Sequence, residues 1–560
     1  MRLMIKNILL VYPQFGKTYW GYQYMLDYIG KKALMPPLGL ITIAAMVPDD
    51  YEIKLVDLNC EPLLPEHLVW ADMVCLSAML PQKTEMLKLA KQCRQAGKFV
   101  VAGGPYPSAC PDECRDACDV LILDEGEVTW REFLNDLATG NLKTEYRTSE
   151  KPDLSSSPVP RYDLLNIDNY VYLTIQISRG CPFLCEFCDI IVMLGRKPRL
   201  KSGEQVLAEL EAIYRTGYRG GIFIVDDNFI GNKKVIKQML PKIQQWNDDY
   251  KKPFSFGTEA SINLADDKVL MQAMVQADFV WVFIGIETPS EVGLKEIRKT
   301  QNTRCSLVDQ VEIIQRHGLM VYGGFIIGFD SDDETIFQTQ IDFIEQAAIP
   351  NVMIGPLVAL PKTPLYERLE KTGRLVHSDA DEARTVASGY TNIRTVMPNL
   401  LLLEGYKKIL QTIYQPEAFF QRTLNVFARF PKDKQGQSLW NKIRQGNLSK
   451  IHRDKRSRLL STWRALNNLR LLYQHMPVDF RRAAFKFSAK VIMRHPNQLH
   501  RLFAYILFAF HYYQFTNCHA IPSIEKFIET ERLNPQMQIP VKTSATHSQI
   551  EVSIEFMDVN

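Results

Sequence analysis

Three cysteines in one short loop carry the clearest chemistry in this sequence. Cys181, Cys185 and Cys188 form a C-x3-C-x2-C pattern directly after an apolar stretch, Val171 to Ile177, that is typical of a strand. Each protein thiolate of a [4Fe–4S] cluster holds one iron, so three thiolates leave the fourth iron open to a small molecule. A zinc site normally takes a fourth Cys or His within tetrahedral reach, and no Cys-x2-Cys or His pair follows soon after. The spacing therefore favours an open iron–sulfur cluster.

This motif, placed after a strand, resembles the one found in the radical S-adenosylmethionine (SAM) enzymes. In that family the methionyl part of SAM chelates the open iron. The resemblance implies a [4Fe–4S] cluster on the three cysteines, with SAM as its ligand. It also implies that the aromatic residue before the third cysteine, Phe187, lies near the adenine.

The chain around and after this loop alternates strand-like and helix-like segments. The first helix has a clear start, because Ser202 and Gln205 have the spacing of a capping box. Six strand–helix units fit the partial barrel of radical SAM proteins, which is shorter than the eightfold barrel. The predicted strands are Tyr172–Ser178, Gly221–Val225, Phe254–Thr258, Phe279–Gly285, Val321–Gly328 and Asn351–Leu357.

Polar groups at the carboxyl ends of these strands are the candidates for binding SAM. SAM offers an amino group, a carboxylate, ribose hydroxyls and an adenine, so carboxylates and amides are suitable partners. The strand that contains Gly323 to Gly328 resembles the family's glycine–isoleucine strand, which packs under the adenine. The predicted SAM-binding residues are Phe187, Asp226, Asp227, Asn228, Glu259, Glu287, Gly324, Ile326 and Gly328.

The first part of the chain shows five short apolar strands that alternate with helical patterns. Such strands predict a parallel, doubly wound sheet, which binds its ligands at the carboxyl ends of the strands. The dinucleotide fingerprint G-x-G-x-x-G is absent, which disfavours NAD or FAD. The predicted strands are Asn7–Tyr12, Glu52–Asp57, Asp72–Ser77, Phe99–Gly103 and Val120–Leu123.

Placed before a radical SAM motif, this sheet resembles the cobalamin-binding domain of the B12-dependent radical SAM enzymes. The Met35–Leu40 turn and the Gly103–Pro105 loop fit that family's pattern. The loop after Tyr12 lacks the Asp-x-His-x-x-Gly motif of methionine synthase and its relatives, and His67 is the domain's only histidine. We therefore expect cobalamin to bind without a histidine lower ligand. The predicted cobalamin-binding residues are Pro13, Ser77, Gly103, Gly104, Pro105, Glu125 and Gly126.

Cys110, Cys114 and Cys118 form a second triad, with a spacing that would place them along one face of a helix beginning near Pro111. One interpretation is a second cluster or metal site. The other is a set of partly buried thiols on a short helix. The sequence leaves both open.

The length of 560 residues predicts three or four domains rather than one core. Unpaired cysteines, no signal peptide and no apolar run of about 20 residues indicate a protein of the cytoplasm. We predict an α/β protein with five parts. They are a Rossmann-like cobalamin-binding domain at 1–142, a linker at 143–170, a partial (β/α)6 radical SAM barrel at 171–375, a basic helical domain at 376–540 and a disordered tail at 541–560.

The C-terminal third is strongly basic, although the whole chain has a net charge of only +3. Between Pro431 and His500, 16 Lys and Arg residues stand against three Asp residues. Leu459, Trp463 and Leu466 repeat at helical spacing, and the stretch from Phe480 to Met493 is similar. These patterns fit a helical cap on the barrel, a basic amphipathic surface on anionic lipid, or both. Nucleic acid is a third and less favoured partner.

Three segments of this third, Tyr390–Ile393, Gly405–Lys408 and Phe419–Arg422, resemble the extension of a B12-binding radical SAM subgroup that includes hopanoid C-2 methylases. The resemblance implies a methyltransferase that acts on an unactivated carbon of a triterpenoid lipid or another secondary metabolite, using a 5′-deoxyadenosyl radical and methylcobalamin. It also implies an external reductant of the ferredoxin or flavodoxin type, and a location in the cytoplasm or on the inner face of the membrane. Two alternatives stay open: cobalamin-assisted cyclisation or rearrangement, and a non-catalytic cobalamin sensor that binds nucleic acid.

Overall fold

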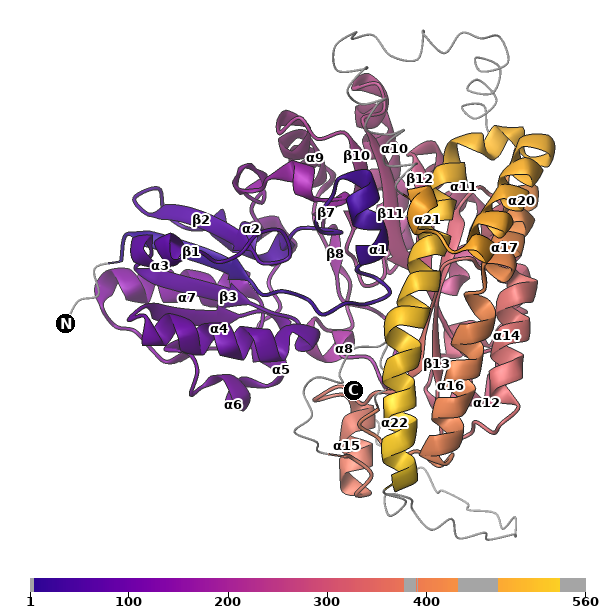
Figure 1. Cartoon of the computed structure of the whole chain (residues 1–560). Helices are drawn as coiled ribbons and strands as arrows, with labels where there is room; N and C mark the ends of the chain where they lie inside the picture. The colour runs from indigo at the N-terminus through magenta and orange to yellow at the C-terminus, as the bar shows by residue number, and fades with distance from the viewer. Residues whose placement is uncertain (1–4, 377–388, 390, 432–471, 534–560) are drawn as a thin grey trace, which may run out of the picture.

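Two six-stranded parallel sheets carry the architecture, and helices pack around both (Figure 1). The structure is a computed structural model that describes residues 5–376, 389, 391–431 and 472–533. The first sheet is formed by the N-terminal part of the chain, and the second follows it after an extended segment. The C-terminal helices lie beside the second sheet (Figure 1).

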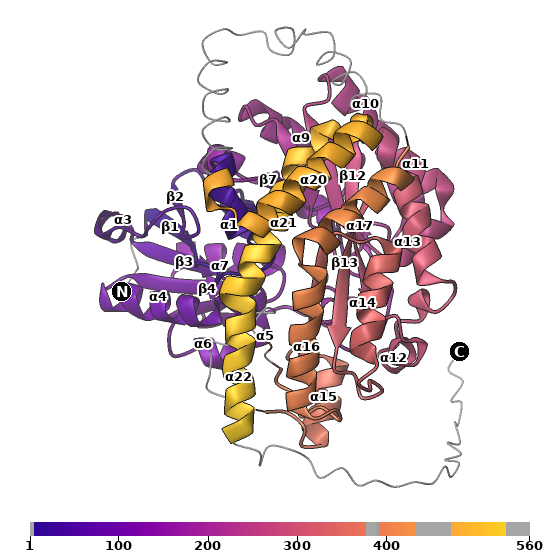
Figure 2. The ribbon, with the colours of Figure 1, turned by 45° about the vertical axis from the view of Figure 1, so that its right-hand side comes forward.

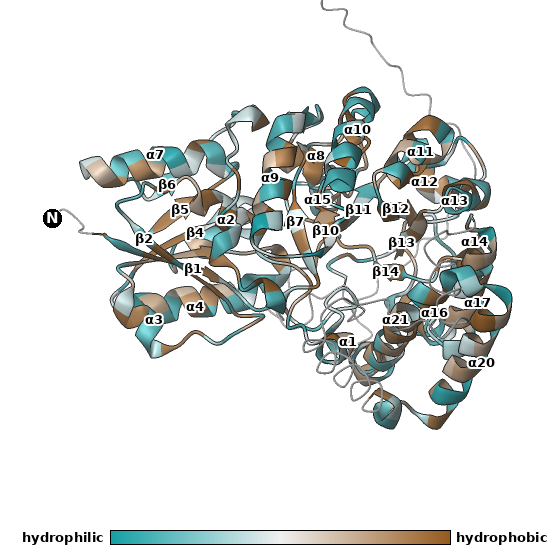
Figure 3. Cartoon of the chain, turned by 90° about the horizontal axis from the view of Figure 1, so that it is seen from above, coloured by the Kyte–Doolittle hydropathy of each residue, from teal (hydrophilic) through white to brown (hydrophobic). Residues whose placement is uncertain are grey.

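The first sheet is parallel, with strand order β2-β1-β3-β4-β5-β6. Its elements are β1 (Asn7–Tyr12), α2 (Leu38–Ala44), β2 (Glu52–Asp57), α3 (Pro65–Trp70), β3 (Met73–Ser77), α4 (Lys83–Gln95), β4 (Phe99–Gly103), α5 (Pro105–Ala109), α6 (Pro111–Cys114), β5 (Val120–Ile122), α7 (Gly126–Thr139) and β6 (Glu145–Tyr146). Successive residues of β1 face opposite cores, Leu9 toward α4 and Leu10 toward α2 and α7. Seen from above, α7 lies on one face and α3 and α4 lie on the other (Figure 3). The predicted doubly wound sheet is confirmed.

Two predictions for this part of the chain need correction. The segment predicted as a linker begins with a strand, because β6 pairs with β5 and extends the sheet. Helix α6 ends at Cys114, so Cys110, Cys114 and Cys118 do not share one helix face. Cys114 and Cys118 are buried in the core beside α4. The structure supports the interpretation of buried thiols.

The second sheet is an open barrel of six parallel strands, with order β14-β13-β12-β11-β10-β7. Its elements are β7 (Tyr172–Ile175), α9 (Gly203–Arg215), β10 (Gly220–Ile224), α10 (Lys233–Asp249), β11 (Phe254–Ala260), α11 (Lys268–Gln276), β12 (Phe279–Glu287), α13 (Leu307–Arg316), β13 (Met320–Ile327), α14 (Ile336–Ala347) and β14 (Val352–Pro356). Ser202 and Gln205 cap α9 reciprocally, as predicted. Along β12, Ile284 is fully buried in the core, whereas Phe283 is only partly buried on the inner face. This confirms the predicted partial barrel.

The long segment between β1 and α2 reaches both edges of this barrel. The indole N–H of Trp20 donates to the sulfur of Met353 on β14 at 2.6 Å. At the other edge, the N–H of Tyr172 on β7 donates to the carbonyl of Leu34 at 2.9 Å. The first domain therefore contributes chain to the region between the two edge strands.

The C-terminal part is helical, as predicted, and packs beside α14 and the barrel (Figure 2). Its helices are α16 (Asn399–Ile413), α17 (Pro416–Arg429), α20 (Val478–Arg494), α21 (Leu502–Phe515) and α22 (Ile521–Leu533). Buried Arg422 of α17 donates to the carbonyl of Ile349 at 2.9 Å, which ties this part to the barrel. Leu459, Trp463, Leu466 and the tail at 541–560 lie outside the described residues. None of the described helices has the length and apolar character needed to cross a membrane.

Candidate active site

A short antiparallel pair closes the base of the loop that holds the three cysteines. β8 (Ser178–Arg179) pairs with β9 (Arg199–Leu200). Gly180 has a φ of +95°, and an added Cβ would lie 2.8 Å from the carbonyl oxygen of Gly195, so the turn requires glycine. The N–H of Cys181 donates to the same carbonyl at 3.2 Å. The backbone therefore fixes the position of the first cysteine.

The thiols of Cys181, Cys185 and Cys188 lie within electrostatic reach of one another. Burial, and then the charges of Asp189 and of the other two thiols, raise the pKa of Cys188 to about 12. A cube-shaped cluster takes each thiolate at a separate corner, whereas a structural zinc site takes a fourth Cys or His ligand. Because these buried thiols disfavour one another's ionisation, they need a positively charged partner to become thiolates. The irons of a cluster supply that positive charge. The set therefore fits a [4Fe–4S] cluster better than zinc.

Two buried carboxylates anchor this loop on opposite sides. Asp226, which follows β10, accepts from the N–H of Ile177 and from the hydroxyl of Ser178, both at 2.7 Å. Both of its oxygens are thus used by the start of the loop, and its contact with SAM stays a prediction. Glu186, between the second and third cysteines, accepts from Arg368 at 2.7 Å. No sequence motif predicts the pairing of Glu186 with Arg368.

Three other carboxylates, from Asp227, Glu259 and Glu287, lie at or just beyond the carboxyl ends of successive strands and influence one another electrostatically. Burial, and then the charges of Asp227, Asp226 and Glu287, raise the pKa of Glu259 to about 8. Burial, and then Asp226, raise the pKa of Asp227 to about 7. Oδ2 of Asp227 is buried without a hydrogen-bond partner among the described residues. Carboxylates held this way fit a cationic ligand with hydroxyl donors, and SAM carries a sulfonium, an ammonium and a ribose.

A buried ion pair holds the last of these carboxylates. A register shift near the end of β12 leaves Glu287 with a φ of +64°, an uncommon conformation for a residue with a side chain. The carboxylate of Glu287 pairs with the ammonium of Lys299, and both side chains are nearly buried. A Cβ on Gly285 would lie 2.4 Å from Oε1 of Glu287 and 2.7 Å from Nζ of Lys299. The pair therefore needs glycine at that position, and Lys299 is a site residue that the sequence did not single out.

The residues predicted to surround the adenine lie around the same end of the barrel. A Cβ on Gly324 would lie 2.8 Å from the ring of Phe283, so β13 carries no side chain at that point. Gly328 ends the strand with a φ of +92°, and its N–H donates to Asp332 at 2.8 Å. Ile326 is partly buried, and so is Phe187, whose ring lies 6.0 Å from Nζ of Lys299. Their contacts with SAM stay predictions.

The residues predicted to bind cobalamin lie at or just beyond the carboxyl ends of β1, β3, β4 and β5. Gly104 has a φ of +93°, and a Cβ there would lie 2.5 Å from Oγ of Ser77, so glycine lets the ends of β3 and β4 meet closely. Gly103 ends β4, and Pro105 and Gly126 begin α5 and α7. The carbonyl of Pro13 accepts from the amide of Gln82 at 2.6 Å. Their backbone exposes a flat glycine-bearing edge, which fits a large planar ligand.

Among the described residues of the first domain, no histidine lies at the carboxyl edge of the sheet. Nδ1 of His67 accepts from the N–H of Leu64 at 3.2 Å and caps the start of α3. The expectation that cobalamin binds without a histidine lower ligand stays a prediction.

Two arginines join the cysteine loop to the cobalamin-binding edge. Arg179 donates to Glu127 at 2.7 and 2.8 Å and to Glu125 at 2.9 Å. Arg199 donates to both oxygens of Glu125, at 2.8 and 2.9 Å. Burial alone would raise the pKa of Glu127, but the hydrogen bonds and charge of Arg179 outweigh it and lower the pKa to about 2. Since these bonds occupy the carboxylate of Glu125, its direct contact with cobalamin stays a prediction.

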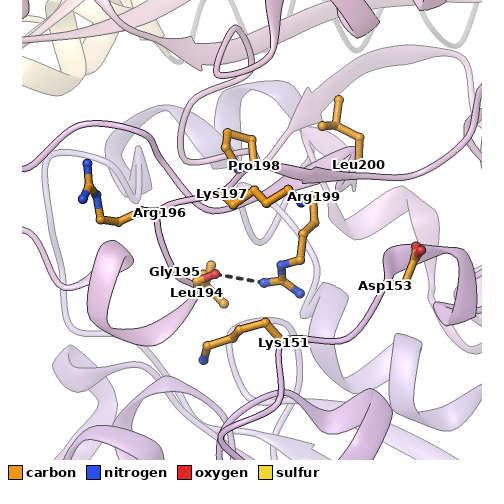
Figure 4. Close-up of a pocket in the computed structure, with 9 residues that line it drawn as sticks. All are labelled: Lys151, Asp153, Leu194, Gly195, Arg196, Lys197, Pro198, Arg199 and Leu200. Carbon is orange, nitrogen blue, oxygen red and sulfur yellow. Dashed lines mark hydrogen bonds between the residues drawn. The ribbon is translucent and has the colours of Figure 1, made fainter. Parts of the chain in front are cut away.

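A basic pocket of about 480 Å³ opens beside the cysteine loop (Figure 4). It is lined by Lys151, Asp153 and residues 194–200. Arg196 and Lys197 are exposed and have no ion-pair partner in the described part of the chain, and Asp153 is the one acidic lining residue. The wall includes Gly195, whose carbonyl accepts from the N–H of Cys181. The pocket is thus positively charged and one hydrogen bond away from Cys181.

Comparison with known proteins identifies three regions of the chain. Residues 32–134 match the B12 binding domain, residues 175–340 match the radical SAM superfamily, and residues 363–521 match a domain of unknown function, DUF4070. An uncharacterized methyltransferase of Synechocystis sp. is 42% identical over 438 residues, which cover 78% of this chain and 81% of that protein. The hopanoid C-2 methylase of Rhodopseudomonas palustris is 35% identical over 434 residues, which cover 74% of this chain and 78% of that protein.

The fold also matches a solved structure, that of the cobalamin-dependent SAM radical enzyme OxsB with aqua-cobalamin and SAM bound. The TM-score is 0.57 at 15% identity, and the match covers 95% of this chain and 84% of that chain. The two matched domains account for the cofactors that the site fits: a [4Fe–4S] cluster, SAM and cobalamin. The chain belongs to the family of cobalamin-dependent radical SAM methyltransferases that includes the hopanoid C-2 methylase.

Proposed function

We propose that this enzyme methylates an unactivated carbon of an apolar, polycyclic lipid of the hopanoid type. One structural observation carries the choice of an apolar substrate. An aromatic cluster lies on barrel strands β10, β12 and β13: Trp281 stacks on Tyr322 at 4.9 Å and lies 5.2 Å from Phe223, between ring centroids. Such a cluster excludes water and offers little to a polar substrate. The 35% identity to the hopanoid C-2 methylase supports the same class.

When bound, the cluster, SAM and cobalamin would supply a 5′-deoxyadenosyl radical and a transferable methyl group. The chain's own residues bind and orient these groups. Asp227, Glu259 and Glu287 accept from the ammonium and ribose hydroxyls of SAM, since their carboxylates share one buried space. Asn228 donates from its amide to Cys181, and Asp226 holds the loop. Phe187, Gly324, Ile326 and Gly328 surround the adenine.

The first domain holds cobalamin at its carboxyl edge through the backbone near Ser77, Gly103 and Gly104. Pro13, Pro105 and Gly126 border the same edge. Glu125 acts through Arg179 and Arg199, which keep this edge against the cysteine loop. The distance between the two cofactors is then set by a buried interdomain contact.

An external one-electron donor of the ferredoxin or flavodoxin type docks, on this proposal, at the basic pocket beside the cluster. Arg196 and Lys197 offer unpaired positive charge to an acidic protein. Electron-transfer complexes are small and depend on such complementarity. The Cys181–Gly195 hydrogen bond gives a short path from this surface to the cluster.

The enzyme also rests, on this proposal, on the inner face of an anionic membrane through α20. Phe485 and Met493 of this helix are 76% and 70% exposed, and Ile492 is exposed beside them. Arg482 and Lys486 lie exposed along the same helix. A basic helix with exposed apolar side chains fits a lipid surface, from which a membrane lipid would reach the barrel.

Lipid profiling of a strain that lacks the gene tests the substrate class. We expect methylated hopanoids to disappear and their unmethylated forms to accumulate, and a plasmid copy with all three cluster cysteines changed to alanine should fail to restore them. An unchanged hopanoid profile in a strain that makes methylated hopanoids would refute the proposed substrate.

A further inference from the structure

A short segment after α12 (Glu291–Glu296) brings two buried polar side chains, Lys299 and Gln301, close to the cysteines. It comprises Lys299 and the 3-10 turn Thr300–Asn302. Lys299, Gln301 and Asn302 are 8%, 3% and 1% exposed, although all three side chains are polar. Buried polar side chains normally need a hydrogen-bond partner that offsets the free-energy cost of removing them from water. Their partners therefore indicate what the segment does.

Gln301 directs its amide at a cluster ligand. Its Nε2 donates to Sγ of Cys185 at 3.8 Å, and both residues are buried. Its Oε1 is buried without a hydrogen-bond partner among the described residues. The N–H of this amide therefore points at sulfur while its oxygen has no partner. This arrangement favours a sulfur that carries negative charge, because hydrogen bonds to a charged acceptor are stronger.

Lys299 brings a positive charge to the same place. Its ammonium, paired with Glu287, interacts electrostatically with the thiols of Cys185 and Cys188. Its Nζ also lies 6.0 Å from the ring of Phe187, one of the two residues between Cys185 and Cys188. The neighbouring Asn302 differs, since it donates to the backbone carbonyls of Gly285 and Ile286, at 3.1 and 3.0 Å.

We propose that Gln301 and Lys299 are positioning residues that raise the reduction potential of the [4Fe–4S] cluster through Cys185 and Cys188. Reduction adds one electron to the cluster, and the added negative charge spreads onto the thiolate sulfurs. An N–H donor and an ammonium aimed at those sulfurs stabilise the reduced state more than the oxidised state. The proposal concerns the cluster alone and does not depend on which substrate is methylated.

A redox titration followed by electron paramagnetic resonance tests this on the full chain with its cluster, without SAM, cobalamin or substrate. At the wild-type midpoint, Gln301→Leu should lower the ratio of reduced to oxidised cluster about tenfold, which corresponds to about 59 mV for one electron. Lys299→Met should lower it at least as much, and Lys299→Arg should restore most of it. Asn302→Leu is the matched control and should leave the ratio unchanged.

Gln301→Glu is a second test, in case Gln301→Leu fails to hold the cluster. It keeps the shape of the side chain and places an acceptor against sulfur, so it should lower the ratio further than Gln301→Leu. The proposal is overturned if iron-replete Gln301→Leu or Gln301→Glu keeps the wild-type ratio. It is also overturned if Asn302→Leu shifts the ratio as much as they do, because the effect would then come from packing.

Discussion

The guanidinium of Arg179 lies against the carboxylate of Glu127, with hydrogen bonds of 2.7 and 2.8 Å and little exposure of either side chain. Arg179 stands two residues before the first cluster cysteine, and Glu127 lies in the first turn of α7 in the cobalamin-binding domain. This ion pair, together with the pairs of Glu125, therefore links the cysteine loop to the cobalamin-binding domain.

Removal of the Arg179–Glu127 ion pair should lower the stability of the fold and the coupling of SAM cleavage to methyl transfer. Arg179→Met leaves the carboxylates of Glu125 and Glu127 buried without their partner, and loss of one partner of a buried pair costs about 3–5 kcal/mol. Glu127→Gln in the same chain should recover part of this cost, because the two changes act on one interaction. Urea unfolding of the four variants measures the coupling. We also expect more 5′-deoxyadenosine per methylated product.

The matched control is Arg215→Met, which breaks an exposed pair with Glu211 on α9. Such surface pairs contribute about 0–1 kcal/mol, so this variant should behave like the wild type. Equal losses in Arg179→Met and Arg215→Met would mean that the interdomain pair has no special role.

Low pH should remove the stabilisation that the Arg179–Glu127 ion pair provides. The pKa of Glu127 is about 2 in the folded chain and 4.5 without its partners, so its contribution to stability is complete above pH 4.5 and lost as the pH falls toward 2. By linkage this contribution is about 3 kcal/mol. The cluster-free wild type should exceed Glu127→Gln in urea stability at pH 7, and the difference should shrink steadily below pH 4.5. A difference that stays constant down to pH 3 would contradict the assignment.

Charge reversal at the basic pocket should affect protein reductants selectively. We expect the double variant Arg196→Glu/Lys197→Glu to lower turnover with reduced ferredoxin about tenfold at low salt, and less at high salt, because screening weakens the steering. Turnover with dithionite should match the wild type. Lys91→Glu, which changes an exposed lysine of α4, is the control. An equal loss with both reductants would place the defect in the cluster instead of the docking surface.

The exposed face of α20 should govern binding to lipid. Phe485→Ser/Met493→Ser should lower cosedimentation with phosphatidylglycerol vesicles several-fold, while phosphatidylcholine vesicles bind the wild type weakly. Val269→Ser on α11, where the valine is 68% exposed, is the matched control. If the wild type dimerises through this face and the double variant is monomeric, the face is a contact between copies and the membrane assignment fails.

The strands and most helices follow from the sequence because their signals are local. Predicted Asn7–Tyr12 and Glu52–Asp57 agree with β1 and β2 to the residue, since each is a short strand bounded by polar or turn residues. The two-residue strand β6 escaped prediction because its pairing with β5, and not its own composition, makes it a strand. The helix expected near Pro111 begins there but ends at Cys114, so the three cysteines do not lie along a single helix.

The site residues also divide into those that the sequence predicts and those that it does not. The cysteine spacing and the carboxylates at strand ends are visible in the chain. The pairs that tune and assemble the site are not, because Gln301 lies 116 residues from Cys185 and Arg179 lies 52 residues from Glu127. Lys299 and Gln301 carry only the signal of polar residues shortly after a strand, which many surface residues share.

The central claim is carbon methylation of a hopanoid-type lipid, and label transfer in vitro tests it most directly. Purified enzyme with its cluster, cobalamin, reductant and SAM carrying a trideuteromethyl group would be incubated with an unmethylated hopanoid and analysed by mass spectrometry. We predict a product heavier by one trideuteromethyl group in place of hydrogen, absent in Cys185→Ala. Cleavage of SAM together with a rearranged or cyclised product that carries no label would contradict the account.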